Sequence, residues 1–145
     1  MFAITLFDEH ANEIICIRDR AGVKPFYYYW KKDLFLFGSE LKSITAHISF
    51  EKKINPDAVA SYLQYGYVSN SHCIYKDTFK LPPGYLLRLN LSTQTISLSQ
   101  YWNVYDYYNK PKLKINLPDA IEETERILKE SFDLRMVAGV PVGVF

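Results

Sequence analysis

Two cysteines, Cys16 and Cys73, carry the thiols that could serve as catalytic nucleophiles in this sequence. A nucleophilic thiol needs a base within hydrogen-bonding reach. Cys16 lies inside the apolar segment 13–17, where a free cysteine is usually a small buried hydrophobe. Cys73 follows His72, but neighbouring residues of an extended segment point to opposite faces, so the two side chains should not meet. The sequence therefore predicts no nucleophile–base pair.

The other common kinds of reactive site are also missing from the sequence pattern. The three histidines, His10, His47 and His72, do not have metal-ligand spacing. No glycine-rich phosphate loop of either standard pattern occurs. Two cysteines form no disulfide framework, which favours reduced thiols in a cytoplasmic protein. We expect no metal site and no self-sufficient active site.

Three segments nevertheless combine residue types in an unusual way. Residues 18–25 place three cations and one acid between apolar segments, and residues 38–42 place an acid and a base where a strand should give way to a helix. A solvated turn and a capped helix explain both most simply, because surface charges near turns are common. The apolar run 140–145 is typical of the first strand of a domain that continues elsewhere.

The elements that must position these segments are mostly short strands. Alternating or apolar runs predict strands at residues 2–7, 13–17, 26–30, 34–37 and 85–89, separated by polar turns. A short helix is predicted over 40–48. A second helix should begin at Asn55 and Pro56 and end at Gly66.

The last part of the chain has a different pattern. Residues 103–116 are polar, without periodicity, and predict an inter-domain linker. Pro118 and Asp119 then begin a long helix. Its predicted features are an apolar face of Ile121, Leu128 and Phe132, and two i,i+4 ion pairs, Glu122 with Arg126 and Glu125 with Lys129.

Composition limits the classes of function. Hydrophobic residues make up 48% and aromatic residues 16% of the 145 residues, which indicates a folded protein with a core. A net charge of +1 argues against a nucleic-acid partner. No apolar run is long enough to span a bilayer, and residues 1–8 lack the features of a signal peptide.

Seven segments, in order along the chain, resemble motifs of the glutamine-hydrolysing asparagine synthetases. Residues 1–8 resemble the family's GMFAFALWD, 18–28 its RDRxGxKPLYY, 38–43 its ASELKAL, 62–68 its YLxFGYxP, 80–85 its KLPPGHYL, 101–102 its YW, and 140–145 its VPVGxxLSGGxDS. Together the segments extend over almost the whole chain.

The resemblance implies an α+β fold with two parts. Residues 1–102 would be the C-terminal half of a glutaminase domain (glutamine amidotransferase type 2), which is a partial N-terminal-nucleophile-type αββα sandwich with mostly antiparallel β structure. Residues 103–116 would be the linker. Residues 117–145 would supply the first helix and strand of an α/β adenine-nucleotide α-hydrolase-like domain, the ATP-binding domain of asparagine synthase.

The resemblance also implies the chemistry of the whole enzyme. A glutaminase releases ammonia from glutamine with an amino-terminal cysteine, and the ammonia passes through a tunnel. A ligase domain activates aspartate with ATP and Mg²⁺, and ammonia displaces AMP. The second residue here is Phe2 and the phosphate loop would follow Phe145, so the family's catalytic residues are expected to lie outside this chain, which alone should be inactive.

A few residues match family positions with a role. Phe145 aligns with the residue whose backbone meets the adenine of ATP, and Met1 and Val23 align with apolar positions along the ammonia tunnel. The motif positions near the domain interface, expected to form an ion-pair network, are Arg18, Asp19, Arg20, Lys24, Ser39, Glu40 and Lys42.

Two other interpretations stay open at this point. One is a paralogue that amidates another carboxylate, because the acceptor pocket would lie after Phe145. The other is a non-catalytic remnant that binds its parent enzyme through an exposed sheet edge. Whether Met1 is a genuine start, and whether the protein forms a homodimer, are also open.

Overall fold

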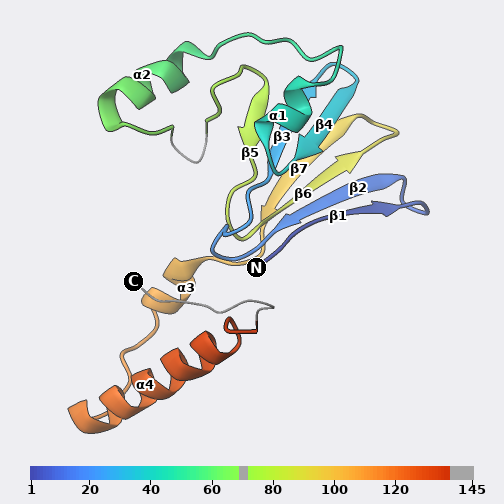
Figure 1. Cartoon of the computed structure of the whole chain (residues 1–145). Helices are drawn as coiled ribbons and strands as arrows, with labels where there is room; N and C mark the ends of the chain where they lie inside the picture. Colours follow the sequence, from blue (N-terminus) through green and yellow to red (C-terminus); the bar gives the residue numbers. More distant parts are fainter. Residues whose placement is uncertain (69–71, 138–145) are drawn as a thin grey trace. The chain divides into compact units, whose positions relative to one another are not determined.

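A computed structural model describes residues 1–68 and 72–137 (Figure 1). The chain divides into two compact units, Met1–Tyr108 and Asn109–Phe145. The first contains seven antiparallel strands and three short helices among its described residues, and the second is built on one long helix. This is the α+β composition predicted from the sequence.

The larger sheet contains two hairpins. Its strands, in the order β1-β2-β6-β7, are β1 (Ala3–Asp8), β2 (Glu13–Arg18), β6 (Tyr85–Asn90) and β7 (Thr95–Gln100). All three neighbouring pairs are antiparallel. The register sets Cys16 opposite Thr5 on one side and Leu87 on the other. Pairing of β2 with β6 thus joins segments about seventy residues apart.

The smaller sheet has the order β4-β3-β5, and two helices lie between β4 and β5 in the chain. Its strands are β3 (Tyr27–Lys31), β4 (Leu34–Gly38) and β5 (Thr78–Lys80). Helix α1 (Leu41–Thr45) packs on β3 and β4, and α2 (Pro56–Tyr65) follows.

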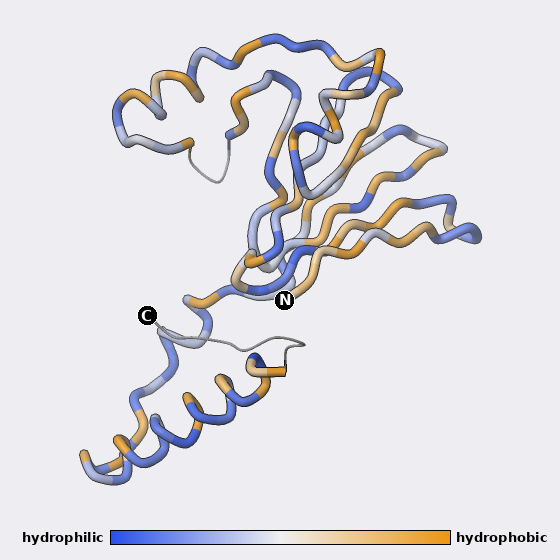
Figure 2. Tube along the Cα trace, in the orientation of Figure 1, coloured by the Kyte–Doolittle hydropathy of each residue, from blue (hydrophilic) through white to orange (hydrophobic). Residues whose placement is uncertain are grey.

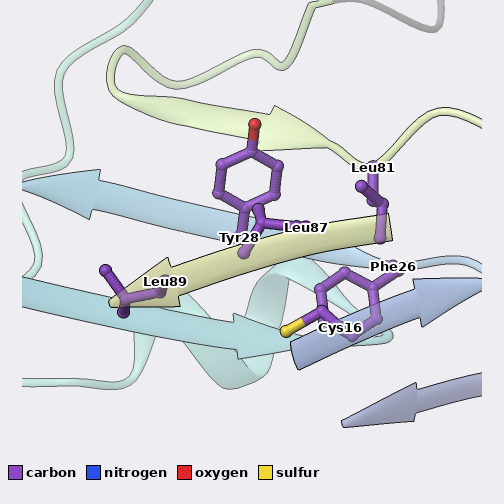
Figure 3. Close-up of a cluster of buried hydrophobic side chains, with 6 residues drawn as sticks. All are labelled: Cys16, Phe26, Tyr28, Leu81, Leu87 and Leu89. Atoms are coloured by element: carbon purple, nitrogen blue, oxygen red, sulfur yellow. The ribbon is translucent and has the colours of Figure 1, made fainter. Parts of the chain in front are cut away.

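The main hydrophobic core lies between the two sheets (Figure 3). Its buried members are Cys16 from β2, Leu87 and Leu89 from β6, Phe26 directly before β3, Tyr28 within β3, and Leu81 directly after β5. A second cluster of Tyr29, Ile44 and Phe50 lies on the other face of the smaller sheet. Tyr28 and Tyr29 enter different clusters because successive side chains of a strand point to opposite faces.

The outer face of the larger sheet is apolar and exposed on the β1 side. Ile4 and Leu6 of β1 are exposed there, opposite Ile17 and Ile15 of β2. Hydrophobic segments run along both strands in Figure 2. Large apolar areas on a protein surface mark contact sites, so this face is suited to being covered by further protein.

The ends of α2 follow the predicted caps. The Asn55 side chain accepts a hydrogen bond from the Asp57 N–H at the start of α2, and Gly66 ends the helix with φ 77°. Helix α4 (Leu117–Asp133) begins one residue before the predicted Pro118, and it is capped by Asn116, whose side chain accepts a hydrogen bond from the Asp119 N–H.

The apolar face predicted for α4 is present, but neither of its two predicted ion pairs, Glu122 with Arg126 and Glu125 with Lys129, is formed among the described residues. Ile121, Leu128 and Phe132 are all more than half exposed within this unit. Arg126 pairs with Glu123 at 2.7 Å and with Glu130 at 2.6 Å, in place of Glu122. Both observed partners are one helical turn from Arg126, one turn before it and one after it, and together they hold both ends of its guanidinium.

The structure also contains elements that the sequence pattern did not predict. These are β5, β7 and a five-residue helix, α3 (Val104–Tyr108), within the predicted linker. The unit boundary after Tyr108 also falls inside that segment. None of the helices within the described ranges has both the length and the apolar character that crossing a membrane requires.

The segment between the units should be the first site of proteolysis. Residues 109–116 are exposed and belong to no helix or strand. Trypsin is expected to cut after Lys112 or Lys114 before it cuts after Lys31 or Lys32 in the β3–β4 hairpin, since cleavage needs a locally unfolded chain. Mass spectrometry of early fragments checks this, with the Lys112→Gln/Lys114→Gln double variant as control. Earlier cleavage in the hairpin would show that the boundary is misplaced.

Candidate functional site

The predicted site residues that lie together do so at the end of β2. We call this the Arg18–Asp19 junction: Arg18, Asp19, the 20–25 loop, Phe2, the 81–84 turn and Tyr101. Its members come from four separate stretches of the chain. Because they are distant in sequence, side chains rather than a continuous strand ladder must hold them.

Arg18 binds carbonyl groups from two of these stretches. The residue is only 8% exposed. Its Nε donates to the Lys24 carbonyl at 2.8 Å, Nη2 to the Gly22 carbonyl at 2.7 Å, and Nη1 to the Leu81 carbonyl at 2.6 Å. A guanidinium has five N–H donors in a fixed fork, so one side chain can hold the loop and the turn together.

Asp19 binds N–H groups in a complementary way. It is 5% exposed. Its Oδ1 accepts from the Val23 N–H at 3.0 Å, and Oδ2 accepts from the N–H groups of Lys24 at 3.0 Å and Phe2 at 3.2 Å. Burial alone would raise the pKa of this carboxyl, but the three N–H donors favour the charged form and hold its pKa below the usual value.

Backbone contacts complete the junction. The Asp19 N–H donates to the Phe2 carbonyl at 3.0 Å, and the Gly84 N–H donates to the Asp19 carbonyl at 3.1 Å. The Tyr101 hydroxyl donates to the Arg18 carbonyl at 2.6 Å. Arg18 and Asp19 therefore hold the 20–25 loop, the 81–84 turn and the start of β1 together.

Two glycines allow the close approach of these segments. Gly22 has φ 63°, and a Cβ there would lie 2.7 Å from the Pro83 Cγ. Gly84 has φ 71°, and a Cβ there would collide with the Trp102 carbonyl oxygen. Both positions need a residue without a side chain, for backbone conformation and for space.

The two residues that resemblance assigns to an ammonia tunnel lie at this junction. Val23 and Phe2, the neighbour of Met1, donate to the same Asp19 carboxylate. The Met1 and Val23 side chains are 67% and 52% exposed. Both apolar side chains are thus exposed next to backbone that the junction holds.

The remaining predicted interface residues divide into two groups. At the junction, Arg20 and Lys24 are exposed, whereas Arg18 and Asp19 bind mainly backbone groups. The described residues there therefore do not form the expected ion-pair network. At the start of α1, Glu40 and Lys42 form an exposed ion pair of 2.6 Å next to the exposed Ser39. Phe145 lies outside the described residues.

Both thiols are buried. Cys16 is 0% exposed, and burial raises the pKa of its thiol to about 11, although the Thr5 hydroxyl contacts the sulfur at 3.7 Å. Cys73 is buried as well. The prediction of a buried Cys16 is confirmed, and a thiol with so high a pKa holds almost no thiolate near neutral pH.

The junction also contains Tyr101, Leu81 and Gly84, whose role there was not predicted from the sequence. The segments 80–85 and 101–102 stand out only through their resemblance to family motifs. A short proline-rich turn followed by glycine indicates a close backbone contact, which could have pointed to this role.

A second polar cluster ties β3 to the loops beside it. Lys31 lies 2.7 Å from Glu51 Oε2 and 3.3 Å from Asp77, and Lys53 is also 2.7 Å from Glu51 Oε2. Hydrogen bonding and charge attraction from Lys31 and Lys53 lower the pKa of the Glu51 carboxyl to about 2.

This cluster predicts a loss of stability in acid. A carboxyl whose pKa is lowered by folding contributes stability above its unfolded pKa, near 4.5, and loses that contribution as the pH falls towards 2. In urea unfolding at pH 7 and pH 3, Glu51→Gln should lower stability at pH 7 and have a smaller effect at pH 3. An equal effect of the substitution at both pH values would contradict this assignment.

Comparison with known proteins identifies the family. A family model described as a glutamine amidotransferase domain matches residues 1–102, which is the strand-rich part that contains the junction. The chain therefore belongs to the glutamine amidotransferase domain family. Amidotransferases of this class use glutamine, which agrees with the resemblance found in the sequence.

The similar curated proteins are much longer than this chain. It is 43% identical over 150 residues to "Putative asparagine synthetase [glutamine-hydrolyzing] 2" of Methanocaldococcus jannaschii, covering 100% of the chain and 28% of that protein. It is 28% identical over 152 residues to "Asparagine synthetase [glutamine-hydrolyzing] 2" of Bacillus subtilis, covering 100% and 20%. It is also 29% identical over 147 residues to "Amidase chry2" of Gibberella zeae, covering 99% and 21%.

Proposed function

We propose that this chain is part of a glutamine-hydrolysing asparagine synthase, an ATP-dependent amide ligase. The observation that carries the proposal is the match of the whole chain, at 43% identity, to a protein named as a glutamine-hydrolysing asparagine synthetase. The glutamine amidotransferase match over residues 1–102 supports the glutaminase half of this assignment.

The proposal divides the chain in the same way as the sequence pattern. Residues 1–102 are the later half of the glutaminase domain, 103–116 the linker, and 117–145 the start of the ATP-binding domain. The exposed outer face of β1 and β2 and the exposed apolar face of α4 are then surfaces that the rest of the enzyme covers.

In the complete enzyme, glutamine, aspartate and ATP are the small-molecule substrates, and Mg²⁺ accompanies ATP. Residues 1–68 and 72–137 offer no group of three acidic, histidine or cysteine side chains placed to hold a metal ion. We therefore assign no step at ATP or Mg²⁺ to the described residues.

The chain's own contribution is to shape the path of ammonia. The Arg18–Asp19 junction holds the backbone on which Met1 and Val23 stand. Apolar side chains along such a path keep water away, and in the absence of water ammonia is less readily protonated or lost. Arg20, Lys24, Ser39, Glu40 and Lys42 are exposed, as contacts to a neighbouring domain would require.

A second candidate is a superfamily member that amidates a different carboxylate. This candidate is considered because the chain also matches, over 99% of its length, a protein named "Amidase chry2", whose name is not that of an asparagine synthetase. The glutaminase role is the same in both candidates, and they differ in the acceptor of the ammonia.

An assay of the polypeptide that contains this chain, with its native flanking sequence, separates the two candidates. Glutamine, aspartate and Mg²⁺·ATP should give glutamate, AMP and asparagine, and ammonium chloride should replace glutamine. Products with another carboxylic acid but not with aspartate would favour the second candidate. Absence of glutamate with every acceptor would contradict both.

A further inference from the structure

One carboxylate joins the start of β1 to the 20–25 loop. Asp19 accepts from the Phe2 N–H, seventeen residues earlier, and from the N–H groups of Val23 and Lys24. The Asp19 N–H also donates to the Phe2 carbonyl, so Phe2 is bound at both of its backbone groups. The regular pairing of β1 with β2 begins one residue further on, at Ala3 and Arg18.

We propose that Asp19 is a positioning residue that fixes the start of β1 against the 20–25 loop and so holds Met1 and Val23 on one apolar wall. This inference rests on the proposed function for the purpose of that wall, which is to carry ammonia. The positioning itself rests only on the contacts of Asp19.

The loop depends on side chains because it has little other support. It lies between β2 and β3, outside both ladders. Its one internal backbone hydrogen bond at this end runs from the Gly22 N–H to the Asp19 carbonyl. Arg18 holds the loop's carbonyls at Gly22 and Lys24, and Asp19 holds its N–H groups at Val23 and Lys24.

The two side chains have separate tasks within this arrangement. Arg18 connects the loop to the Leu81 carbonyl, on the side of the 81–84 turn. Asp19 connects it to Phe2, on the side of β1. A change at Asp19 should therefore free the loop from β1 while the contacts of Arg18 with the turn remain.

Hydrogen exchange in the full chain tests the positioning. Asp19→Asn keeps the volume but replaces one accepting oxygen by an NH₂ group, which cannot accept the N–H groups now bound there. The amide protons of Val23 and Lys24 are expected to exchange about tenfold faster, because one loses its acceptor and the other keeps only an uncharged acceptor. Exchange in the centre of β6 should stay unchanged.

Asp8→Asn is the matched control. Asp8 accepts from the Ala11 N–H at 3.0 Å in an exposed turn, so its change should affect that turn alone. Unchanged exchange at Val23 and Lys24 in Asp19→Asn would overturn the proposal. If that variant does not fold, an NMR titration of the wild-type chain decides. The amide shifts of Val23 and Lys24 should follow the Asp19 carboxyl with one midpoint, and independent midpoints would overturn the proposal.

An activity measurement on the complete polypeptide tests the purpose of the wall. Asp19→Asn should lower the amount of asparagine formed per glutamate released, with the ammonia-dependent rate unchanged, because ammonia escapes before it reaches the ligase. An unchanged ratio beside faster loop exchange would overturn the link to ammonia. A wild-type polypeptide without glutamine-dependent amidation would remove the proposed function and leave the exchange result standing.

Discussion

Replacing Arg18 by methionine is expected to lower the free energy of unfolding by about 3 kcal/mol or more. Methionine is similar in length but has no donor for the carbonyls of Gly22, Lys24 and Leu81. Each buried acceptor left without a partner costs about 1–3 kcal/mol, and the Asp19 carboxylate next to Arg18 loses a nearby positive charge.

Urea unfolding followed by circular dichroism measures this effect. Arg88→Met is the matched control, because Arg88 lies half-exposed on β6 and forms a 3.4 Å ion pair with Glu13. A surface pair of this kind contributes about 0–1 kcal/mol. Equal losses in the two variants would show that Arg18 does not hold the junction together.

The second large effect is expected in the core. Leu87 is fully buried between the two sheets, within the cluster of Figure 3. Leu87→Ala removes buried methyl groups and leaves a cavity, which costs about 2–5 kcal/mol. Urea unfolding followed by circular dichroism measures this loss, and Leu98→Ala is the control variant.

Leu98 is a close match because it stands directly opposite Leu87 in the β6–β7 pair but is 47% exposed. Its loss should cost clearly less, about 1 kcal/mol, since part of its side chain already contacts water. A loss for Leu98→Ala as large as that for Leu87→Ala would mean that the core is not centred between the sheets.

Much of the fold could be predicted from local pattern. Strand β1 was predicted at residues 2–7 and is Ala3–Asp8, and β2 was predicted at 13–17 and is Glu13–Arg18. Asn55 and Gly66 bind backbone groups close to them in the chain, so their roles at the ends of α2 follow from residue type.

One of the elements that were missed, β5, depends on a distant partner. Strand β5 has three residues and exists because it pairs with Tyr27, Tyr28 and Tyr29, about fifty residues earlier. Strand β7 has the alternation of a strand, with Ile96 and Leu98 between polar residues, and it pairs with the neighbouring β6, so local pattern could have predicted it.

The candidate site was predictable only in part, for a similar reason. The sequence shows the charged residues of the 18–25 segment, and it predicted ion pairs among them. Arg18 instead binds a carbonyl 63 residues away, and Asp19 binds an N–H of β1. Backbone groups look the same in every residue, so a sequence does not show which of them a buried charge will bind.

We propose that this chain supplies the scaffold of a glutaminase and not its reactive groups. Catalysis of glutamine hydrolysis needs an activated nucleophile and donors for the oxyanion. Cys16 is buried with a raised thiol pKa, and Cys73 is buried too. Under this proposal, the activated nucleophile and the oxyanion donors come from the rest of the enzyme.

The most direct test is to incubate the purified 145-residue chain with glutamine, aspartate and Mg²⁺·ATP and to follow glutamate and AMP. Cys16→Ser and Cys73→Ser variants are assayed beside it. We expect neither product above the buffer blank in any of the three proteins. Glutamate release by the wild-type chain that disappears in either cysteine variant would contradict the account, because it would show that the chain contains a glutaminase nucleophile of its own.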